Sequence, residues 1–192
     1  MINVYHQKFD DMWFAAALED DRVFATNFGS DKSKVIKQLL ASLPCKMPFQ
    51  IAEKSNQLAE KLLATMKSVY MGEDVTSDFK FEMSHLPSYS RRVLSVLRMV
   101  LVGYVTTYGA LAKATGGGAR AVGNVMAANP FAPLIPCHRV VSFDFTLGGY
   151  GGGLVVKQKI LEREDRGYQE PRKIKVDDMI LAVFPVDFLR KD

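Results

Sequence analysis

The first half of the chain mixes short apolar runs with apolar residues at helical spacing. Residues 12–17 and 23–28 are apolar runs separated by a charged segment, which predicts a β-hairpin. Apolar residues repeat at helical intervals within residues 31–43 and again within residues 53–70, which predicts two helices. Residues 79–83 alternate apolar and charged side chains, the period of a half-buried strand. This order of elements is typical of a small α/β domain.

The pattern changes after a proline-containing linker at residues 84–88. Residues 90–102 carry an apolar stripe with arginines on the opposite face, which predicts a core helix. Residues 108–114 and 119–129 then form two shorter helical segments separated by three glycines. The glycines supply a tight turn, and Pro130 ends the second helix. The arrangement is that of a helix-turn-helix.

Two domains are therefore expected. Residues 1–84 form an α/β N-terminal domain, and residues 85–192 form a mainly α C-terminal domain that contains the helix-turn-helix. Thr106 or Thr107 is expected to cap the first helix of that motif. A last helix runs to about residue 165. The chain after Gly167 is so apolar that we expect it to pack back on the body of the protein or on a partner.

Composition agrees with an ordinary globular protein of one large or two small domains. The chain has 192 residues, of which 48% are hydrophobic and 24% are charged. Its net charge of +4 is compatible with binding a polyanion but does not require one. The start of the chain is interrupted by charged residues, and no apolar run reaches the roughly 18 residues that cross a bilayer. Neither secretion nor membrane insertion is expected.

The cysteines and histidines indicate a reducing cellular compartment and argue against a structural metal. Cys45 and Cys137 lie far apart and form no disulfide framework, which suits a reducing compartment. We therefore expect a cytoplasmic protein that works at the nucleoid, or a nuclear one if the source is a eukaryote. Three histidines spread along the chain and the isolated Cys45 do not form a plausible zinc site, so no metal is expected.

The strongest candidate for chemistry is Cys137, which stands between a proline and His138. A thiolate is a strong nucleophile near neutral pH, and an adjacent imidazole is one way of making one. On the last predicted helix, Glu164 falls on the same side as Val156 and Ile160. A carboxylate that faces the core needs a partner, and His138 is the candidate. The alternative is a surface Glu164 paired with a lysine or arginine.

The second helix of the helix-turn-helix has one face almost without bulk. Ala119, Gly123 and Ala127 share that face with Arg120, its one long side chain. Such a face lets the backbone approach a nucleic-acid groove closely. Close packing against another helix uses the same small residues and stays open as an alternative. The glycine-rich segment around Tyr150 lacks the features of a phosphate-binding loop and fits a pocket wall better.

Residues 89–165 resemble the active-site region of the O6-alkylguanine-DNA alkyltransferases. The residues that carry the resemblance, in the family's order and spacing, are Arg120-Ala121-Val122-Gly123, Asn129-Pro130, Pro136-Cys137-His138-Arg139-Val140-Val141, Tyr150 and Gly152-Gly153-Leu154. The resemblance implies the two-domain alkyltransferase architecture, in which residues 1–84 would be the RNase H-like N-terminal domain.

The resemblance also implies DNA repair by direct reversal of damage. An alkyl group would move from O6-alkylguanine in duplex DNA, with O4-alkylthymine as a further candidate lesion, to Cys137 after the nucleotide flips out of the helix. The thioether product is not hydrolysed, so each molecule would act once as a methylated-DNA–protein-cysteine methyltransferase. No cofactor is implied because the damaged DNA donates the alkyl group. We expect a monomer that binds the minor groove of DNA.

Individual roles follow from the residue matches. Cys137 would be activated through His138 and Glu164 by way of a water molecule, and Asn129 would brace the turn before the cysteine. Arg120 would fill the space of the flipped nucleotide. The residues that would bring the helix against the groove are Ala119, Ala121, Gly123 and Ala127. The residues that would contact the base are Tyr108, Met126, Val140, Tyr150 and Gly151, with the main-chain carbonyls of Cys137 and Val140 accepting from the guanine amino group.

One departure and three rival functions remain. Gly151 stands where many members of the family have serine, which removes a hydroxyl from the lid over the base. The nearest rival is an alkyltransferase-like protein that recognises damage without repairing it, but such proteins have another residue in place of Cys137. A cysteine hydrolase and a helix-turn-helix regulator with Cys137 as a redox sensor are the others.

Overall fold

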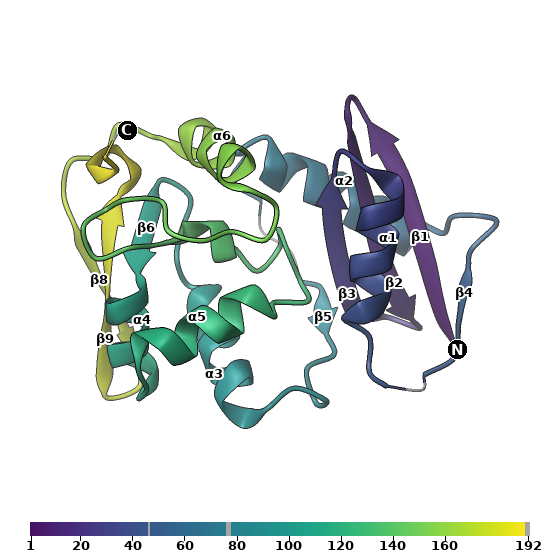
Figure 1. Cartoon of the computed structure of the whole chain (residues 1–192), viewed down its shortest axis with the longest axis horizontal. Helices are drawn as coiled ribbons and strands as arrows, with labels where there is room; N and C mark the ends of the chain where they lie inside the picture. The colour runs from purple at the N-terminus through teal and green to yellow at the C-terminus, as the bar shows by residue number, and fades with distance from the viewer. Residues whose placement is uncertain (46, 76–77, 191–192) are drawn as a thin grey trace. The chain divides into compact units, whose positions relative to one another are not determined.

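The computed structural model describes residues 1–45, 47–75 and 78–190 (Figure 1). The chain divides into two compact units, each described by itself below. The first unit is built from Met1–Tyr70, Asp74–His85 and Pro130–Leu134. The second is built from Met71–Glu73, Leu86–Asn129 and the chain from Ile135 onward. None of the helices in the described residues is long and apolar enough to cross a membrane.

The first unit is a mixed five-stranded sheet with a helix on each face (Figure 1). Its strands, in the spatial order β4-β1-β2-β3-β5, are β4 (Phe49–Ile51), β1 (Ile2–Phe9), β2 (Met12–Glu19), β3 (Arg22–Gly29) and β5 (Lys80–Phe81). Helix α1 (Lys32–Ala41) packs Val35 and Leu39 on one face of the sheet. Helix α2 (Gln57–Tyr70) sets Tyr70 against Phe14, which points to the other face.

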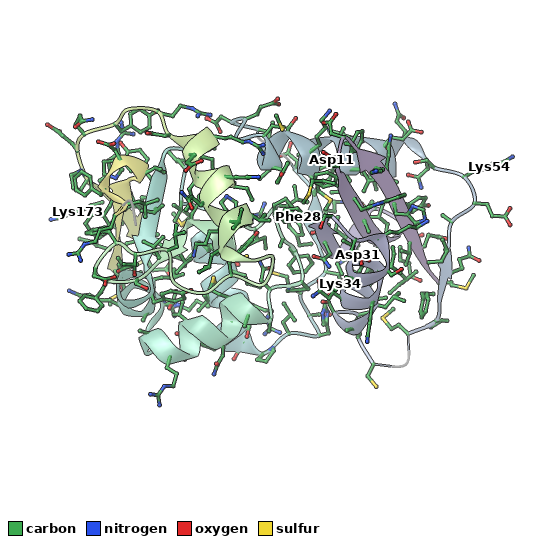
Figure 2. The ribbon with its side chains drawn as sticks, turned by 45° about the horizontal axis from the view of Figure 1, so that its top comes forward. Asp11, Phe28, Asp31, Lys34, Lys54 and Lys173 are labelled. Carbon is green, nitrogen blue, oxygen red and sulfur yellow. The ribbon has the colours of Figure 1, made fainter. Side chains whose placement is uncertain are left out.

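The predicted hairpin and both predicted helices of this unit are confirmed. Asp31 accepts a hydrogen bond from the backbone N–H of Lys34 at 3.0 Å and caps α1, and Figure 2 shows the two side chains at the start of that helix. Asn56 accepts from the N–H of Ala59 at 2.8 Å, so α2 begins at Gln57, later than the predicted start at residue 53. Strand β1 was not predicted, because its second half is polar and exposed.

The second unit combines four α-helices with a four-stranded sheet. The helices are α3 (Ser88–Leu97), α4 (Tyr108–Thr115), α5 (Ala119–Ala127) and α6 (Leu154–Glu164). The strands, in the spatial order β7-β6-β9-β8, are β7 (Val140–Val141), β6 (Tyr104–Thr107), β9 (Met179–Pro185) and β8 (Arg172–Val176). The expectation of a mainly α C-terminal domain missed this sheet. It also made α3 too long, since the helix ends at Leu97 and residues 98–102 run on without helical structure.

The apolar tail packs on the second unit itself, as one of the two expected outcomes. Strand β9 pairs antiparallel with β6, and the Thr106 hydroxyl donates to the carbonyl of Ala182 at 2.8 Å. Strand β8 extends the sheet to an edge from which Lys173 projects (Figure 2). The tail therefore completes a sheet whose central strand, β6, leads directly into α4.

Two glycines fix the turn between α4 and α5. Gly116 takes a left-handed φ of +75° as the C-cap of α4, a conformation that favours glycine. Gly117 lies against the Tyr89 ring, and a Cβ there would overlap it. At the other end of α4, the Thr107 side chain accepts from the N–H of Ala110 and is the cap. Helices α4 and α5 pack on each other and on α3.

Candidate functional site

Cys137 begins a 3-10 turn, Cys137–Arg139, that leads from Pro136 into β7. The turn is closed by backbone hydrogen bonds from Cys137 to Ile135 at 2.8 Å and from Arg139 to Pro136 at 2.9 Å. The Cys137 side chain is buried, with 7% of the residue exposed. Because β7 pairs in parallel with β6, the thiol is held at the end of a buried two-strand ladder. The Cys137 thiol is therefore held in place by the backbone of this turn.

Asn129 connects the end of α5 to this turn. Its side-chain amide donates to the carbonyl of Ile135 at 2.9 Å, and the side chain also hydrogen-bonds Cys137. Burial raises the pKa of the Cys137 thiol, whereas the bond from Asn129 and the nearby charge of Lys157 oppose that rise. The thiol rests protonated at neutral pH and needs a base to become a nucleophile.

His138 and Glu164 form a fully buried pair beside the thiol. The imidazole Nε2 lies 2.9 Å from Oε1 of Glu164, and neither residue has any exposed surface. Nδ1 of His138 is buried and has no hydrogen-bond partner within the described residues. If Nε2 carries the proton and donates to Glu164, Nδ1 presents a lone pair that can accept one. This is the geometry of a base and its orienting carboxylate.

Arg139 is a third residue of this buried cluster, and its role was not predicted from the sequence. Its Nε donates to Oε2 of Glu164 at 2.9 Å and its terminal nitrogen to Oε1 at 2.8 Å, a bidentate contact. A third bond goes to the carbonyl of Val100 at 2.5 Å, in the non-helical segment after α3. Glu164 faces the core and meets His138, as expected; the alternative of a surface Glu164 is wrong, although an arginine does pair with it in the core.

This pairing sets the charges at the site. Burial alone would raise the pKa of Glu164, but the contacts with His138 and Arg139 outweigh it and lower that pKa to about 2. Burial lowers the pKa of His138, although Glu164 opposes the shift. Burial, with a smaller contribution from the charge of Arg139, therefore keeps the imidazole neutral at pH 7 and able to accept a proton.

The glycine-rich segment, residues 147–153, lies against Tyr108 and α6. Gly148 has a left-handed φ of +67°, and a Cβ there would sit 3.1 Å from the Tyr108 ring. The Tyr108 hydroxyl donates weakly to the carbonyl of Gly149 at 3.4 Å. The Tyr150 hydroxyl is buried without a partner in the described residues, and burial raises its pKa well above the ordinary value. An added Cβ at Gly151 would meet no atom within 4 Å, so the missing serine hydroxyl has space.

Lys157 of α6 is a second residue that the sequence pattern did not single out. It is fully buried, and its ammonium donates to the carbonyls of Val140 and Leu147, both at 2.6 Å, and of Gly149 at 3.4 Å. Burial lowers its pKa to about 8. The available signal was its helical phase, since Lys157 falls on the same stripe of α6 as Ile160 and Glu164.

The exposed face of α5 carries the residues expected at DNA. Ala119, Arg120 and Ala127 are exposed, while Ala121 and Gly123 are partly buried. Gly123 would accept a Cβ with no atom within 4 Å. The alternative of close helix packing at Gly123 is therefore wrong. Val122 and Val125 face the core instead, and Met126 is half-buried at the edge of that face.

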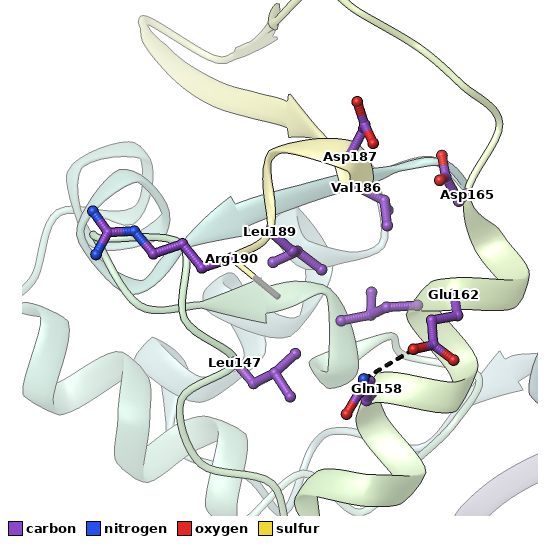
Figure 3. A pocket seen from close by; sticks show the side chains of 9 residues that line it. Leu147, Gln158, Glu162, Asp165, Val186, Asp187, Leu189 and Arg190 are labelled. Carbon is purple, nitrogen blue, oxygen red and sulfur yellow. Dashed lines mark hydrogen bonds between the residues drawn. The ribbon is translucent and has the colours of Figure 1, made fainter. Parts of the chain in front are cut away.

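A cavity of about 420 Å³ lies in the second unit beyond α6 (Figure 3). Its lining residues are Leu147, Gln158, Leu161, Glu162, Asp165, Val186, Asp187, Leu189 and Arg190. None of the candidate site residues lines it, so it is distinct from the Cys137 site. Across the described residues, no three histidine, cysteine, aspartate or glutamate side chains come together to hold a metal ion.

Sequence comparison places this site within a known segment. Residues 88–166 match the family model of the 6-O-methylguanine DNA methyltransferase DNA-binding domain. A methylated-DNA–protein-cysteine methyltransferase from Pyrobaculum aerophilum is 42% identical over 108 residues, which cover 54% of this chain and 72% of that protein. The Homo sapiens protein of the same name is 36% identical over 116 residues, or 56% of each chain.

The fold agrees with these matches. The structure of O6-methylguanine-DNA methyltransferase from Pyrococcus kodakaraensis strain KOD1 superposes with a TM-score of 0.66 at 28% identity, covering 85% of this chain and 99% of that one. The Mycobacterium tuberculosis O6-methylguanine methyltransferase shares the fold, with a TM-score of 0.67 at 21% identity over 88% and 96% of the two chains. With Cys137 buried inside the matched segment and relatives named for transfer to a protein cysteine, the chain belongs to the methylated-DNA–protein-cysteine methyltransferase family.

Proposed function

We propose that this chain repairs O6-alkylguanine in duplex DNA by taking the alkyl group onto Cys137, once per molecule. The observation that carries the proposal is the buried thiol set in the same turn as His138, whose imidazole is oriented by Glu164 and Arg139. The family's defining activity needs a cysteine that can be deprotonated, and this arrangement places a base beside a buried thiol.

The chemistry follows from the protonation states. Neutral His138 accepts the thiol proton at Nδ1 through a water molecule, because consecutive side chains on a tight turn point apart. Sγ of Cys137 then attacks the alkyl carbon, the bond from that carbon to O6 breaks, and the electron pair goes to the guanine, which takes up a proton. Glu164 stabilises the imidazolium that forms, and Arg139 keeps Glu164 ionised. Since a thioether does not hydrolyse, the protein is consumed.

DNA would be held by α4 and α5 acting as a helix-turn-helix in the minor groove. The exposed small residues of α5 allow its backbone to approach the groove, and Arg120 would occupy the position of the flipped nucleotide. The open space around Gly123 supports this role, because no part of the described chain fills it. The protein would act as a monomer on damaged DNA, wherever in the cell that DNA lies.

The flipped base would enter between β7 and the glycine-rich segment. The Cys137 carbonyl accepts from the Val140 N–H and the Val140 carbonyl from Lys157, and the second lone pair of each oxygen would accept from the guanine amino group. Tyr108, Met126, Tyr150 and Gly151 would line the remaining walls, and Asn129 would brace the turn that carries the thiol. The N-terminal domain, residues 1–84, would be the RNase H-like domain of the architecture, and residues 85–192 would hold the whole reaction.

The test is whether DNA is restored. A duplex is prepared with O6-methylguanine inside a restriction site that the lesion blocks, and cleavage is measured after incubation with the protein. We expect cleavage to return in proportion to the protein added, up to one site per molecule, and the Cys137→Ala variant to restore none. Tight binding with no restoration would instead support the recognition-only alternative, and restoration beyond one site per molecule would contradict single use.

A further inference from the structure

Lys157 is a buried cation whose hydrogen-bond partners in the described residues are all main-chain carbonyls. An ammonium taken out of water is costly, and carbonyls neutralise it less than a carboxylate would. Its three N–H groups are fully used by Val140, Leu147 and Gly149. Because burying the Lys157 ammonium is costly, its position beside the Cys137 thiol indicates a functional role.

The three carbonyls come from two parts of the site. Val140 belongs to β7, the pocket wall that follows the turn carrying Cys137. Leu147 and Gly149 belong to the glycine-rich segment, and Gly149 also accepts from Tyr108. One ammonium therefore ties the glycine-rich segment to the wall. The other link between them is the turn of residues 142–146, which a hydrogen bond from the Ser142 N–H to the Thr146 carbonyl closes at 3.0 Å.

Packing alone does not hold the segment in place. The Leu147 side chain rests on the apolar cluster that includes Leu161 and Val186, but it also borders the cavity of about 420 Å³ (Figure 3). The Leu147 side chain is therefore not fully enclosed by packing. The bond from the Ser142 N–H to the Thr146 carbonyl at 3.0 Å fixes the chain just before the segment, and within the segment the ammonium and the weak bond from Tyr108 hold the backbone beside β7.

Several titratable groups face the same ammonium. The charge of Lys157 opposes the rise in the pKa of Cys137 and adds to the fall in the pKa of His138. The Tyr150 ring centroid lies 6.0 Å from the amine, and Tyr108 shares the Gly149 carbonyl. Burial lowers the pKa of Lys157 to about 8, so it is charged at neutral pH and loses a donor and its charge above that value.

We propose that Lys157 is a positioning residue for alkyl transfer: its ammonium holds the glycine-rich segment against the pocket wall at Val140 and places a positive charge beside the Cys137 thiol. The proposal rests on the proposed function. In this proposal, the single cation Lys157 on α6 keeps the proposed base pocket beside Cys137 closed.

The test compares Lys157→Met with Lys159→Met, a matched loss of charge from an exposed position on the same helix. Single-turnover transfer from an O6-methylguanine duplex is measured below and above pH 8. We expect Lys157→Met to be slower by about tenfold to 100-fold at pH 7, the scale of a small misplacement of reacting groups, and Lys159→Met to match wild type. The ratio of wild-type to Lys157→Met rates should fall as the pH rises past 8. A ratio that stays constant with pH would overturn the proposal.

Two further measurements do not depend on transfer. In a Cys45→Ala background, the rate of Cys137 alkylation by iodoacetamide at pH 7 should fall in Lys157→Met. If that variant has no cooperative melt, amide exchange of residues 147–151 in the wild-type protein, corrected for intrinsic rates, should show less protection at pH 9 than at pH 7. Unchanged thiol reactivity or unchanged protection contradicts the role of Lys157, whereas a wild-type protein that transfers no methyl contradicts the proposed function.

Discussion

At the residue scale, burial lowers the pKa of His138, and the bidentate contact of Arg139 with Glu164 adds to that fall. A buried carboxylate facing only an imidazole would favour a charged imidazolium, which cannot accept a proton. Here the guanidinium takes both carboxylate oxygens, and His138 has a lowered pKa. In the proposed function, this arrangement keeps the base neutral while retaining a carboxylate to stabilise the imidazolium once it forms.

The Arg139→Met variant tests this division of labour. Glu164 would keep its charge without the guanidinium, so the pKa of His138 should rise and the acid limb of the pH–rate profile should move to higher pH. Breaking a buried ion pair from one side should also destabilise the protein by about 3 to 5 kcal/mol. Transfer rates across pH, with urea unfolding on the same samples, measure both effects. A variant whose acid limb stays at the wild-type pH would refute the charge argument.

The site residues that could be predicted from the sequence differ in kind from those that could not. The Cys137–His138 step and the helical phase of Glu164 are local features, and both can be read along the chain. Arg139 and Lys157 were missed because a basic residue is exposed by default. Their partners, the Val100 carbonyl and the carbonyls of the glycine-rich segment, come from distant parts of the sequence. Only the fold brings these groups together.

At the element scale, the small residues of α5 lie on an open face of the helix and not at an interface with another helix. Gly123 in the middle of a helix costs stability relative to alanine, and no neighbouring atom requires it. A residue that weakens its own helix without a packing reason is consistent with a face reserved for a partner. The groove of DNA is that partner in the proposed function.

The Gly123→Ala variant should therefore separate stability from repair. With space for the methyl group, the substitution should raise the free energy of unfolding by about 1 kcal/mol. Transfer from duplex DNA should slow several-fold because the methyl group separates the helix from the groove, while transfer from free O6-methylguanine base should not change. Thermal melts and paired rate measurements on the two substrates provide the data. Faster or unchanged repair of the duplex would remove α5 from the DNA interface.

Arg120→Ala tests the flipping role on the same helix. The side chain is exposed, so no loss of stability is expected. Repair of duplex DNA should fall far more than reaction with the free base, which needs no flipping. Equal losses on both substrates would show that Arg120 acts in some other way.

Elements were predictable where their pattern is local. The hairpin β2–β3 and helices α1, α2 and α5 follow from apolar periodicity and caps. Strands β6 and β7 are only four and two residues long, and their pairing with each other and with β9 joins distant segments. Periodicity carries no signal for pairing at that range. The sheet of the second unit could therefore not be predicted from the sequence.

At the scale of the whole molecule, the buried site makes stability depend on pH. Glu164 has a folded pKa of about 2 against an ordinary 4.5, so its contribution is complete above pH 4.5 and is lost as the pH falls toward 2. His138 has a lowered pKa in the folded state, so the unfolded chain takes up its proton first as the pH falls below 6.5. Both groups destabilise the fold in acid, and His138 begins to do so at the higher pH.

Urea unfolding between pH 7 and pH 3, followed by circular dichroism, measures this dependence. Down to pH 3 the Glu164 contribution should fall by about 2 kcal/mol, since that range covers about 1.5 of the pH units below 4.5 and each unit of pKa is worth about 1.4 kcal/mol. The Glu164→Gln variant should show a flatter profile below pH 4.5. Trp13, the single tryptophan, lies in β2 of the first unit, so its fluorescence reports on a unit without these groups. A wild-type profile as flat as that of Glu164→Gln would contradict the assignment.

The central claim is that Cys137 is the stoichiometric acceptor of the alkyl group. The protein is incubated with excess duplex containing O6-methylguanine and digested with a protease. The masses of its peptides are then measured by mass spectrometry. The account predicts one methyl group per protein molecule, all of it on the peptide that contains Cys137 and none on the peptide that contains the exposed Cys45. Methylation of Cys45 instead, or restored guanine with no methyl group on the protein, would contradict it.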